Sequence, residues 1–237
     1  MGLNQGVAIT WLGHSTFLLR TASGKRILLE GWVDTNPKCP ERLKGLAECD
    51  VMVLSHGHSD HAGDAVAIAR RTGARVVAIY ELASLLEARG VRSTVPMNIG
   101  GRVDVDGIGV TLVRAFHSSS MADGDRPIYA GEAAGYVVRL ENGLAIYHAG
   151  DTTLYGDMAL IGELHHPALA LVPIGDTFTM GPEEAARAVR LVGAQHAIPM
   201  HYGTFPALTG TPERFRAALA ETPAVRVHVM EPGETLE

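Results

Sequence analysis

The chain has 237 residues, of which 46% are hydrophobic, and its formal net charge is −6 at pH 7. This length and composition are typical of a globular chain with a sizeable core, and they exclude a disordered or fibrous protein. An acidic chain also lacks the global basic field that attracts nucleic acid or anionic membranes. We therefore expect one domain over residues 1–237 and a small molecule, not nucleic acid or a membrane, as its partner.

Cysteine content and the N-terminus give a first indication of location. Cys39 and Cys49 are the two cysteines, which is too few for a four-cysteine zinc site or a disulfide framework. Met1–Ala8 lacks the basic region and apolar core of a secretory signal. No apolar run approaches the roughly 18 residues of a membrane span. We predict a cytoplasmic protein, and a homo-oligomer is compatible with its residues.

The first half of the chain reads as strands followed by an alternation of helices and strands. Predicted strands are Val7–Trp11, Phe17–Arg20, Arg26–Leu29, Val51–Leu54 and Arg75–Ile79, and predicted helices are Asp64–Thr72 and Leu82–Arg89.

The second half repeats this order. Asp106-Gly107 and Asn142-Gly143 favour tight hairpin turns, so Val103–Val105 should pair with Val110–Val113, and Tyr136–Leu140 with Leu144–Tyr147. Further on we predict strands Ala168–Pro173 and Val225–Met230 and helices Asp157–Leu164, Glu183–Leu191 and Glu213–Ala220. Two packed sheets with helices on their outer faces, an α/β (α+β) architecture, fit this order.

Four apolar, strand-like runs are each followed at once by residues that can bind a metal. Side chains at strand ends can converge at one edge of a sheet, where a rigid scaffold holds them. The run "VMVLSHGHSDH" supplies His56, His58, Asp60 and His61, and the later runs supply His117, then His148 and Asp151, then His201.

The first of these clusters has the spacing of a metal site. His56 and His58 are two residues apart, so in an extended segment both side chains point to the same side. A lone histidine is usually a solvated surface residue, but four such side chains directly after an apolar strand are not explained in that way. Imidazole and carboxylate ligands suit zinc, and also manganese, iron or nickel. One zinc takes about three protein ligands and a water, so the seven candidates fit two divalent ions. They are His56, His58, Asp60, His61, His117, Asp151 and His201.

The motif "HGHSDH" resembles the signature of the metallo-β-lactamase superfamily. The chain is more closely similar to an uncharacterised family of metal-dependent hydrolases within it, related to the ascorbate-6-phosphate lactonases. The segments "WLGHSTFLL", "SHGHSDHAGD", "AFHSSS", "YHAGDTTLYGDM", "LVPIGDTFTMGPEEAA" and "PMHYGTFP" carry this resemblance.

The resemblance implies a four-layer αββα sandwich with a binuclear site at one edge. It also implies how the candidates divide between the ions. His56, His58 and His117 would bind one metal, Asp60, His61 and His201 would bind the other, and Asp151 would bridge them.

The chain departs from the family pattern at "LLEGWVDTNP". Members usually have aspartate followed by proline at the end of the third strand, where this chain has Glu30 and Gly31. The family's aspartate supports the metal site from behind its ligands, and such partners matter about 10- to 100-fold. Glu30 is one methylene longer, and Asp34 is the alternative residue for this role.

Several polar residues are candidates for roles other than metal binding. Asp60 and His14 are the candidate catalytic residues, and His14 either binds substrate or protonates a leaving group, or caps a strand turn. We expect His148 to support the ligands and not to be one of them. Ser118, Ser119 and Ser120 either hydrogen-bond substrate or close a turn.

These observations favour a metal-dependent hydrolase that uses a metal-bridging hydroxide on a small intracellular substrate. A lactone, a phosphodiester, and an amide or thioester remain open as the bond, because fold does not fix substrate. One alternative is a nuclease or phosphodiesterase acting on nucleic acid or nucleotides. Another is a di-iron oxidoreductase, which the resemblance disfavours because such enzymes usually place glutamate where His58 stands.

Overall fold

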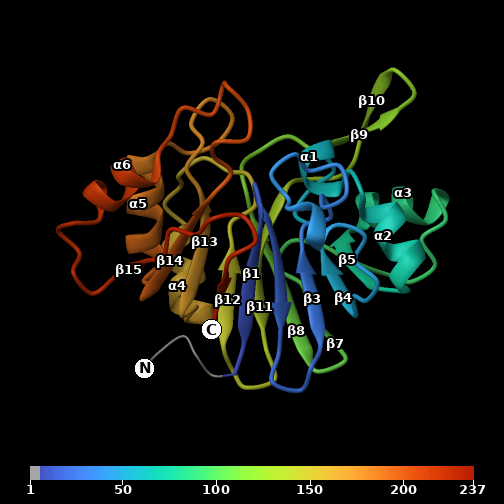
Figure 1. Ribbon diagram of the computed structural model, residues 1–237, viewed down its shortest axis with the longest axis horizontal. Coiled ribbons are helices and arrows are strands. Elements are labelled where there is room, and N and C mark those ends of the chain that lie inside the picture. Colours follow the sequence, from blue (N-terminus) through green and yellow to red (C-terminus); the bar gives the residue numbers. More distant parts are fainter. Residues whose placement is uncertain (1–5) are drawn as a thin grey trace.

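Two seven-stranded sheets form the centre of the molecule, and helices flank them on both sides (Figure 1). The computed structural model describes residues 6–237. Helices α2 and α3 gather on one side, and α4, α5 and α6 gather on the other (Figure 1). The predicted four-layer αββα sandwich is therefore confirmed.

The first sheet holds the N-terminal half of the chain and one C-terminal strand. Its strands run in the order β16-β1-β2-β3-β4-β5-β6. The pairs between β1 and β3 are antiparallel, and those from β3 to β6 are parallel. Its elements are β1 (Ala8–Gly13), β2 (Thr16–Arg20), β3 (Arg26–Leu29), η1 (Glu41–Leu43), β4 (Val51–Val53), α1 (Ser59–Ala62), α2 (Ala65–Thr72), β5 (Arg75–Ile79), α3 (Tyr80–Ala88), β6 (Thr94–Met97) and β16 (Thr235–Leu236).

The second sheet has the same division into antiparallel and parallel parts. Its order is β15-β14-β13-β12-β11-β8-β7, with antiparallel pairs from β7 to β12 and parallel pairs from β12 to β15. Its elements are β7 (Arg102–Val105), β8 (Ile108–Arg114), β11 (Ala134–Arg139), β12 (Ala145–His148), α4 (Met158–His165), β13 (Leu169–Pro173), α5 (Pro182–Val192), β14 (His196–Met200), α6 (Pro212–Ala218) and β15 (Arg226–Val227). A separate hairpin, β9 (Ser120–Asp123) and β10 (Arg126–Tyr129), stands outside both sheets.

Alternation along the strands divides the buried side chains between two hydrophobic clusters. On β13, Leu169 and Leu171 join the cluster that fills the space between the sheets and continues beneath α2 and α3, whereas Ala170 and Val172 join the cluster beneath α4–α6. Successive strand residues point to opposite faces, so a strand covered on both faces must be apolar throughout. The wholly apolar stretch Val51–Leu54 is fully buried for this reason.

The structure adds elements that the sequence did not reveal. β6 contains Pro96, which weakens a strand pattern and is tolerated at the edge of the sheet, where β6 lies. β9 and β10 have only four residues each, mix polar with apolar side chains and contain no fully buried residue, so no clear strand pattern marks them. The last predicted strand, Val225–Met230, shortens to β15 because only Arg226 and Val227 pair with β14.

Some predictions concern the N-terminus, the location and the assembly of the protein. Residues 1–5 of the segment Met1–Ala8, on which the absence of a signal was argued, lie outside the described residues. No helix within residues 6–237 is long and apolar enough to cross a membrane. A single domain, cytoplasmic location and oligomeric state stay predictions.

Candidate metal centre

All seven predicted ligands lie together at one edge of the two sheets. The segment after β4 supplies four of them, and the segments after β8, β12 and β14 supply one each. Three overlapping groups bring their donor atoms within 4.8 Å of one another. The groups are His14, Asp60, His61 and His201; His56, His58 and His117; and His56, His61 and Asp151.

The backbone after β4 places four side chains of one motif around a common point. His56 is fully buried, and its Nδ1 lies 2.9 Å from Ser55 Oγ, so its Nε2 faces the cluster. That Nε2 lies 2.9 Å from His58 Nδ1. His58 is extended and precedes the single turn of α1, which carries Asp60 and His61 to the neighbouring position.

Asp151 lies between His117 on one side and His61 and His201 on the other, and it is only 3% exposed. Its Oδ1 is 3.2 Å from His61 Nε2. Its Oδ2 is 3.0 Å from His201 Nε2 and 3.6 Å from His117 Nε2. Contacts to residues of both ligand groups are the geometry that a shared carboxylate needs.

Several buried polar atoms of the cluster lack hydrogen-bond partners. Within residues 6–237 they include both ring nitrogens of His61 and of His201, and Oδ1 of Asp151. His61 Nε2 and His201 Nε2 lie near Asp151, and His61 Nδ1 lies near Glu30, but none of these contacts has the geometry of a hydrogen bond. A buried polar atom left unsatisfied costs about 1–3 kcal/mol, so such a group of atoms is unfavourable without a further partner. Imidazole nitrogens and carboxylate oxygens are ligands for divalent transition metals, and the residues fit such ions.

The carboxylates control the protonation of the histidines around them. Burial by itself lowers the pKa of His61, but the Asp151 and Glu30 carboxylates raise it well above its usual value. For His201, burial likewise acts to lower the pKa, but the Asp151 carboxylate outweighs it and raises the pKa to about 9. For Asp60, burial acts to raise the pKa, but the hydrogen bond from His14 and the nearby His201 ring hold it well below its usual range. A metal that binds here must therefore displace protons.

His56 is neutral by contrast. Burial is the main cause that holds the pKa of its imidazole well below the usual value, and the neighbouring His61 adds to the effect. Burial also lowers the pKa of His58 and of His117. The three histidines of this group can thus offer lone pairs at neutral pH.

Glu30 occupies the supporting position behind His61. Its side chain is fully buried, and its Oε2 lies 3.4 Å from His61 Nδ1. The Tyr136 hydroxyl donates to Oε1 at 2.8 Å, and the Ser55 amide lies 3.2 and 3.3 Å from the two oxygens. Asp34, the other candidate, instead binds Arg71 at 3.1 Å. The longer side chain of Glu30 therefore reaches the ligand that it has to orient.

His148 has both ring nitrogens in use. Its Nε2–H donates to the Ser15 carbonyl at 2.9 Å, and its Nδ1 accepts from the Gly150 amide at 3.1 Å. The ring stacks on Tyr136 at 4.8 Å between centroids. His148 supports the site and has no free nitrogen for a metal, in agreement with the sequence prediction.

His14 lies against the ligand group that contains Asp60 and His201. It is fully buried, and burial, followed by the nearby His201, lowers its pKa to about 4. A neutral His14 donates from Nε2 to Asp60 Oδ2 at 3.1 Å and accepts at Nδ1 from the Thr204 hydroxyl at 2.9 Å. Its role in catalysis stays a prediction, and its position is beside Asp60.

Three residues of the site have left-handed backbones although none is glycine. The φ angles are 56° for His14, 65° for Glu30 and 57° for His201. Such conformations cost on the order of 1–3 kcal/mol each and persist where the surrounding structure imposes them. Here they turn the chain sharply at the strand ends, so that all three side chains face the cluster.

Two contributors were missed from sequence. Tyr136 lies within an apolar strand, and the pattern around it is that of an ordinary core residue. Thr204 follows His201 in a loop whose sequence gives no indication that its hydroxyl meets His14. Only the fold brings these groups to the site.

The comparisons with known proteins agree with this geometry. A sequence model described as "Beta-lactamase superfamily domain" matches residues 25–202. A "UPF0173 metal-dependent hydrolase" of Rubrobacter xylanophilus is 49% identical over 233 residues, covering 98% of this chain and 96% of that protein. A protein of the same description in Solibacter usitatus is 47% identical over 229 residues, covering 97% of this chain and 99% of that protein. The solved structure of Igni18, described as a novel metallo hydrolase from Ignicoccus hospitalis, is 38% identical with a TM-score of 0.85, and the match covers 97% of each chain.

The fold and the histidine–aspartate cluster thus define a metal-dependent hydrolase of the metallo-β-lactamase superfamily. This confirms the predicted enzyme class, a metal-dependent hydrolase. Within that superfamily, the chain belongs to the UPF0173 metal-dependent hydrolases.

Proposed function

We propose that this protein binds two divalent metal ions, with zinc as the first choice, and hydrolyses a small substrate. The observation that carries the proposal is the set of buried, unsatisfied nitrogens of His61 and His201 beside the Asp151 carboxylate. One ion would be held by His56, His58 and His117, the other by Asp60, His61 and His201, with Asp151 between them.

Two bound ions would supply an activated water and a charge that polarises the bond to be broken. The chain's own residues set the orientation. Asp60 has a side chain 24% exposed, whereas that of Asp151 is 3% exposed, so Asp60 is the carboxylate that can face a substrate. His14 positions Asp60 through the hydrogen bond from Nε2, and Glu30 positions His61.

A small substrate is favoured by the space beside the cluster. A cavity of about 370 Å³ lies against His58 and Asp60. Sites for small molecules and cofactors typically have about 300–1,000 Å³. The acidic net charge of −6 makes a nucleic-acid substrate the weaker candidate.

Metal analysis after expression with zinc or manganese tests the binuclear site. We expect about two ions per chain in the wild type and a reduced content with loss of hydrolysis in His58→Ala, since a zinc site takes about three protein ligands. Less than about one ion per chain, or full activity of His58→Ala, would contradict the proposal.

The bond type is tested by offering the metal-loaded protein a panel of lactones, phosphodiesters, amides and thioesters. We expect turnover of at least one class, abolished by chelation and restored by added metal. If only the phosphodiester reacted, the lactonase-like assignment would be abandoned and the phosphodiesterase alternative adopted.

A further inference from the structure

The cavity beside the metal centre has a second wall, which comes from the β9–β10 hairpin. His58, Ser59 and Asp60 line one side of the 370 Å³ space, and residues between Ser120 and Pro127 line the other. The hairpin stands apart from both sheets and projects beside α1 (Figure 1). A ligand in this cavity therefore touches the metal-binding motif and the hairpin together.

The base of the hairpin is fixed directly to that motif. The Ser119 hydroxyl donates to the Ala130 carbonyl at 3.3 Å and accepts from the Gly57 amide at 3.2 Å. A Cβ at position 57 would lie 2.7 Å from Ala130 Cβ, so glycine permits this close approach. On the other side, Arg89 Nη2 donates to the Ala122 carbonyl at 2.9 Å. These contacts set the distance between the hairpin and the candidate ligands.

The hairpin contributes one permanently charged residue, Arg126, to the lining of the cavity. Arg126 pairs with Asp123 in the backbone register, next to the two-residue turn Gly124-Asp125. Among the described residues that line the cavity, Arg126 is the one arginine or lysine. It makes no ion pair with any residue between 6 and 237, so its guanidinium is available for a ligand. A guanidinium offers paired N–H donors that match the oxygens of a carboxylate or phosphate.

From these contacts we infer that Arg126 is a specificity-determining residue that binds an anionic oxygen group, a carboxylate or a phosphate, on the substrate. This inference rests on the proposed function, because it places that group beside the bond that the metal centre acts on. Asp125 lines the same cavity and carries the opposite charge. It weakens anion binding without removing it, because it does not pair with Arg126.

The test measures binding, not turnover, on the zinc-loaded protein. Phenylphosphonate and phenylacetate, which contain no bond that a hydrolase of this kind cleaves, are titrated by isothermal calorimetry. We expect Arg126→Gln to weaken binding of at least one probe about 10-fold, the scale of one charge-assisted hydrogen bond. A loss confined to phenylphosphonate identifies phosphate as the recognised group, and a loss confined to phenylacetate identifies carboxylate.

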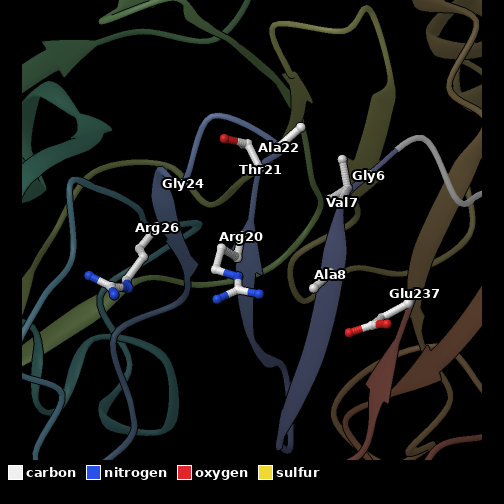
Figure 2. Close-up of a pocket in the computed structure, with 9 residues that line it drawn as sticks. All are labelled: Gly6, Val7, Ala8, Arg20, Thr21, Ala22, Gly24, Arg26 and Glu237. Atoms are coloured by element: carbon white, nitrogen blue, oxygen red, sulfur yellow. The ribbon is translucent and has the colours of Figure 1, made fainter.

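Two further variants separate a specific contact from a general effect of charge. Arg20 is also an arginine without an ion pair in the described part of the chain, but it lines a different cavity (Figure 2). That cavity, of about 550 Å³, lies at the opposite ends of the strands, where Arg20 pairs with Ala8 and Arg26. Arg20→Gln should leave both affinities unchanged. Asp125→Asn should tighten binding about 2-fold, since it removes a like charge.

Equal losses in Arg126→Gln and Arg20→Gln, weaker binding in Asp125→Asn, or no binding of either probe by the wild type would overturn the inference. Hydrolysis that does not depend on Arg126 would overturn it and leave the proposed function standing. Binding that depends on Arg126, without hydrolysis of any panel member, would overturn the proposed function alone. Thermal unfolding of each variant checks that the hairpin substitution leaves the fold intact.

Discussion

Replacement of Glu30 by glutamine should impair one half of the metal centre and spare the other. Glu30 Oε2 faces His61 Nδ1 at 3.4 Å, so a carboxylate there favours a proton on Nδ1 and a free lone pair on Nε2. Glutamine can still accept from Tyr136 and Ser55 with its oxygen, but its amide nitrogen then faces His61 and donates. The imidazole would change to the tautomer with a proton on Nε2, the nitrogen that faces Asp151.

The expected loss of metal affinity in Glu30→Gln is about 10- to 100-fold, the effect of removing such a supporting partner. This equals about 1.4–2.7 kcal/mol of binding free energy. The loss should fall on the site formed by Asp60, His61 and His201. Within the described residues, Glu30 contacts Ser55, Tyr136, His61 and His148, and it makes no hydrogen bond or ion pair with His56, His58 or His117.

Competition with a zinc chelator of known affinity measures both sites of the wild type and the variant. Asp34→Asn is the matched control, because Asp34 was the other residue that the sequence offered and it binds Arg71. We expect Asp34→Asn to bind both ions with wild-type affinity. Unchanged affinities in Glu30→Gln, or an equal loss in Asp34→Asn, would refute this account of the site.

Three other predictions follow from the site and its surroundings. Free zinc at about 100 times Kd should stabilise the fold by about 2.7 kcal/mol for each site that it fills, seen in calorimetry as a rise in Tm of about 5–11 °C per site that chelation abolishes. The raised pKa values of His61 and His201 mean that metal displaces protons, so affinity should rise with pH up to about 9; titration calorimetry in buffers of different ionisation enthalpy would disprove this if no proton were released at pH 7. Gly57→Ala should destabilise the protein by about 1–3 kcal/mol in urea unfolding, because the new Cβ meets Ala130, and a change below about 0.5 kcal/mol would count against that contact.

The parts of the site that the sequence predicted are those encoded locally. His56, His58, Asp60 and His61 occur in one short segment, so their spacing alone predicts a metal site, without knowledge of the fold. His117, Asp151 and His201 could be added because each follows an apolar strand, and strand ends meet at one edge. Their grouping around Asp151 required the distances between elements.

The remainder depends on contacts between distant segments. Glu30 and Asp34 are separated by only four residues, and nothing in their local sequence decides which carboxylate reaches His61. Tyr136 resembles any apolar strand residue until its hydroxyl is seen to meet Glu30. The β9–β10 hairpin was not predicted because its short strands pair only with each other and contain no fully buried residue.

The division of the seven candidate ligands between the two sheets has a consequence for how the molecule opens. Four belong to the loop after β4 of the first sheet, and three follow β8, β12 and β14 of the second. Bound ions would join the two sheets at this edge, in addition to the side-chain packing and the hydrogen bonds, such as Tyr136 to Glu30 and His148 to Ser15, that already link them there. Chelation should then increase hydrogen exchange first at the ends of β4 and β12, before the far ends of the same strands lose protection. Metal supply would in this way govern the cooperativity of unfolding as well as the chemistry.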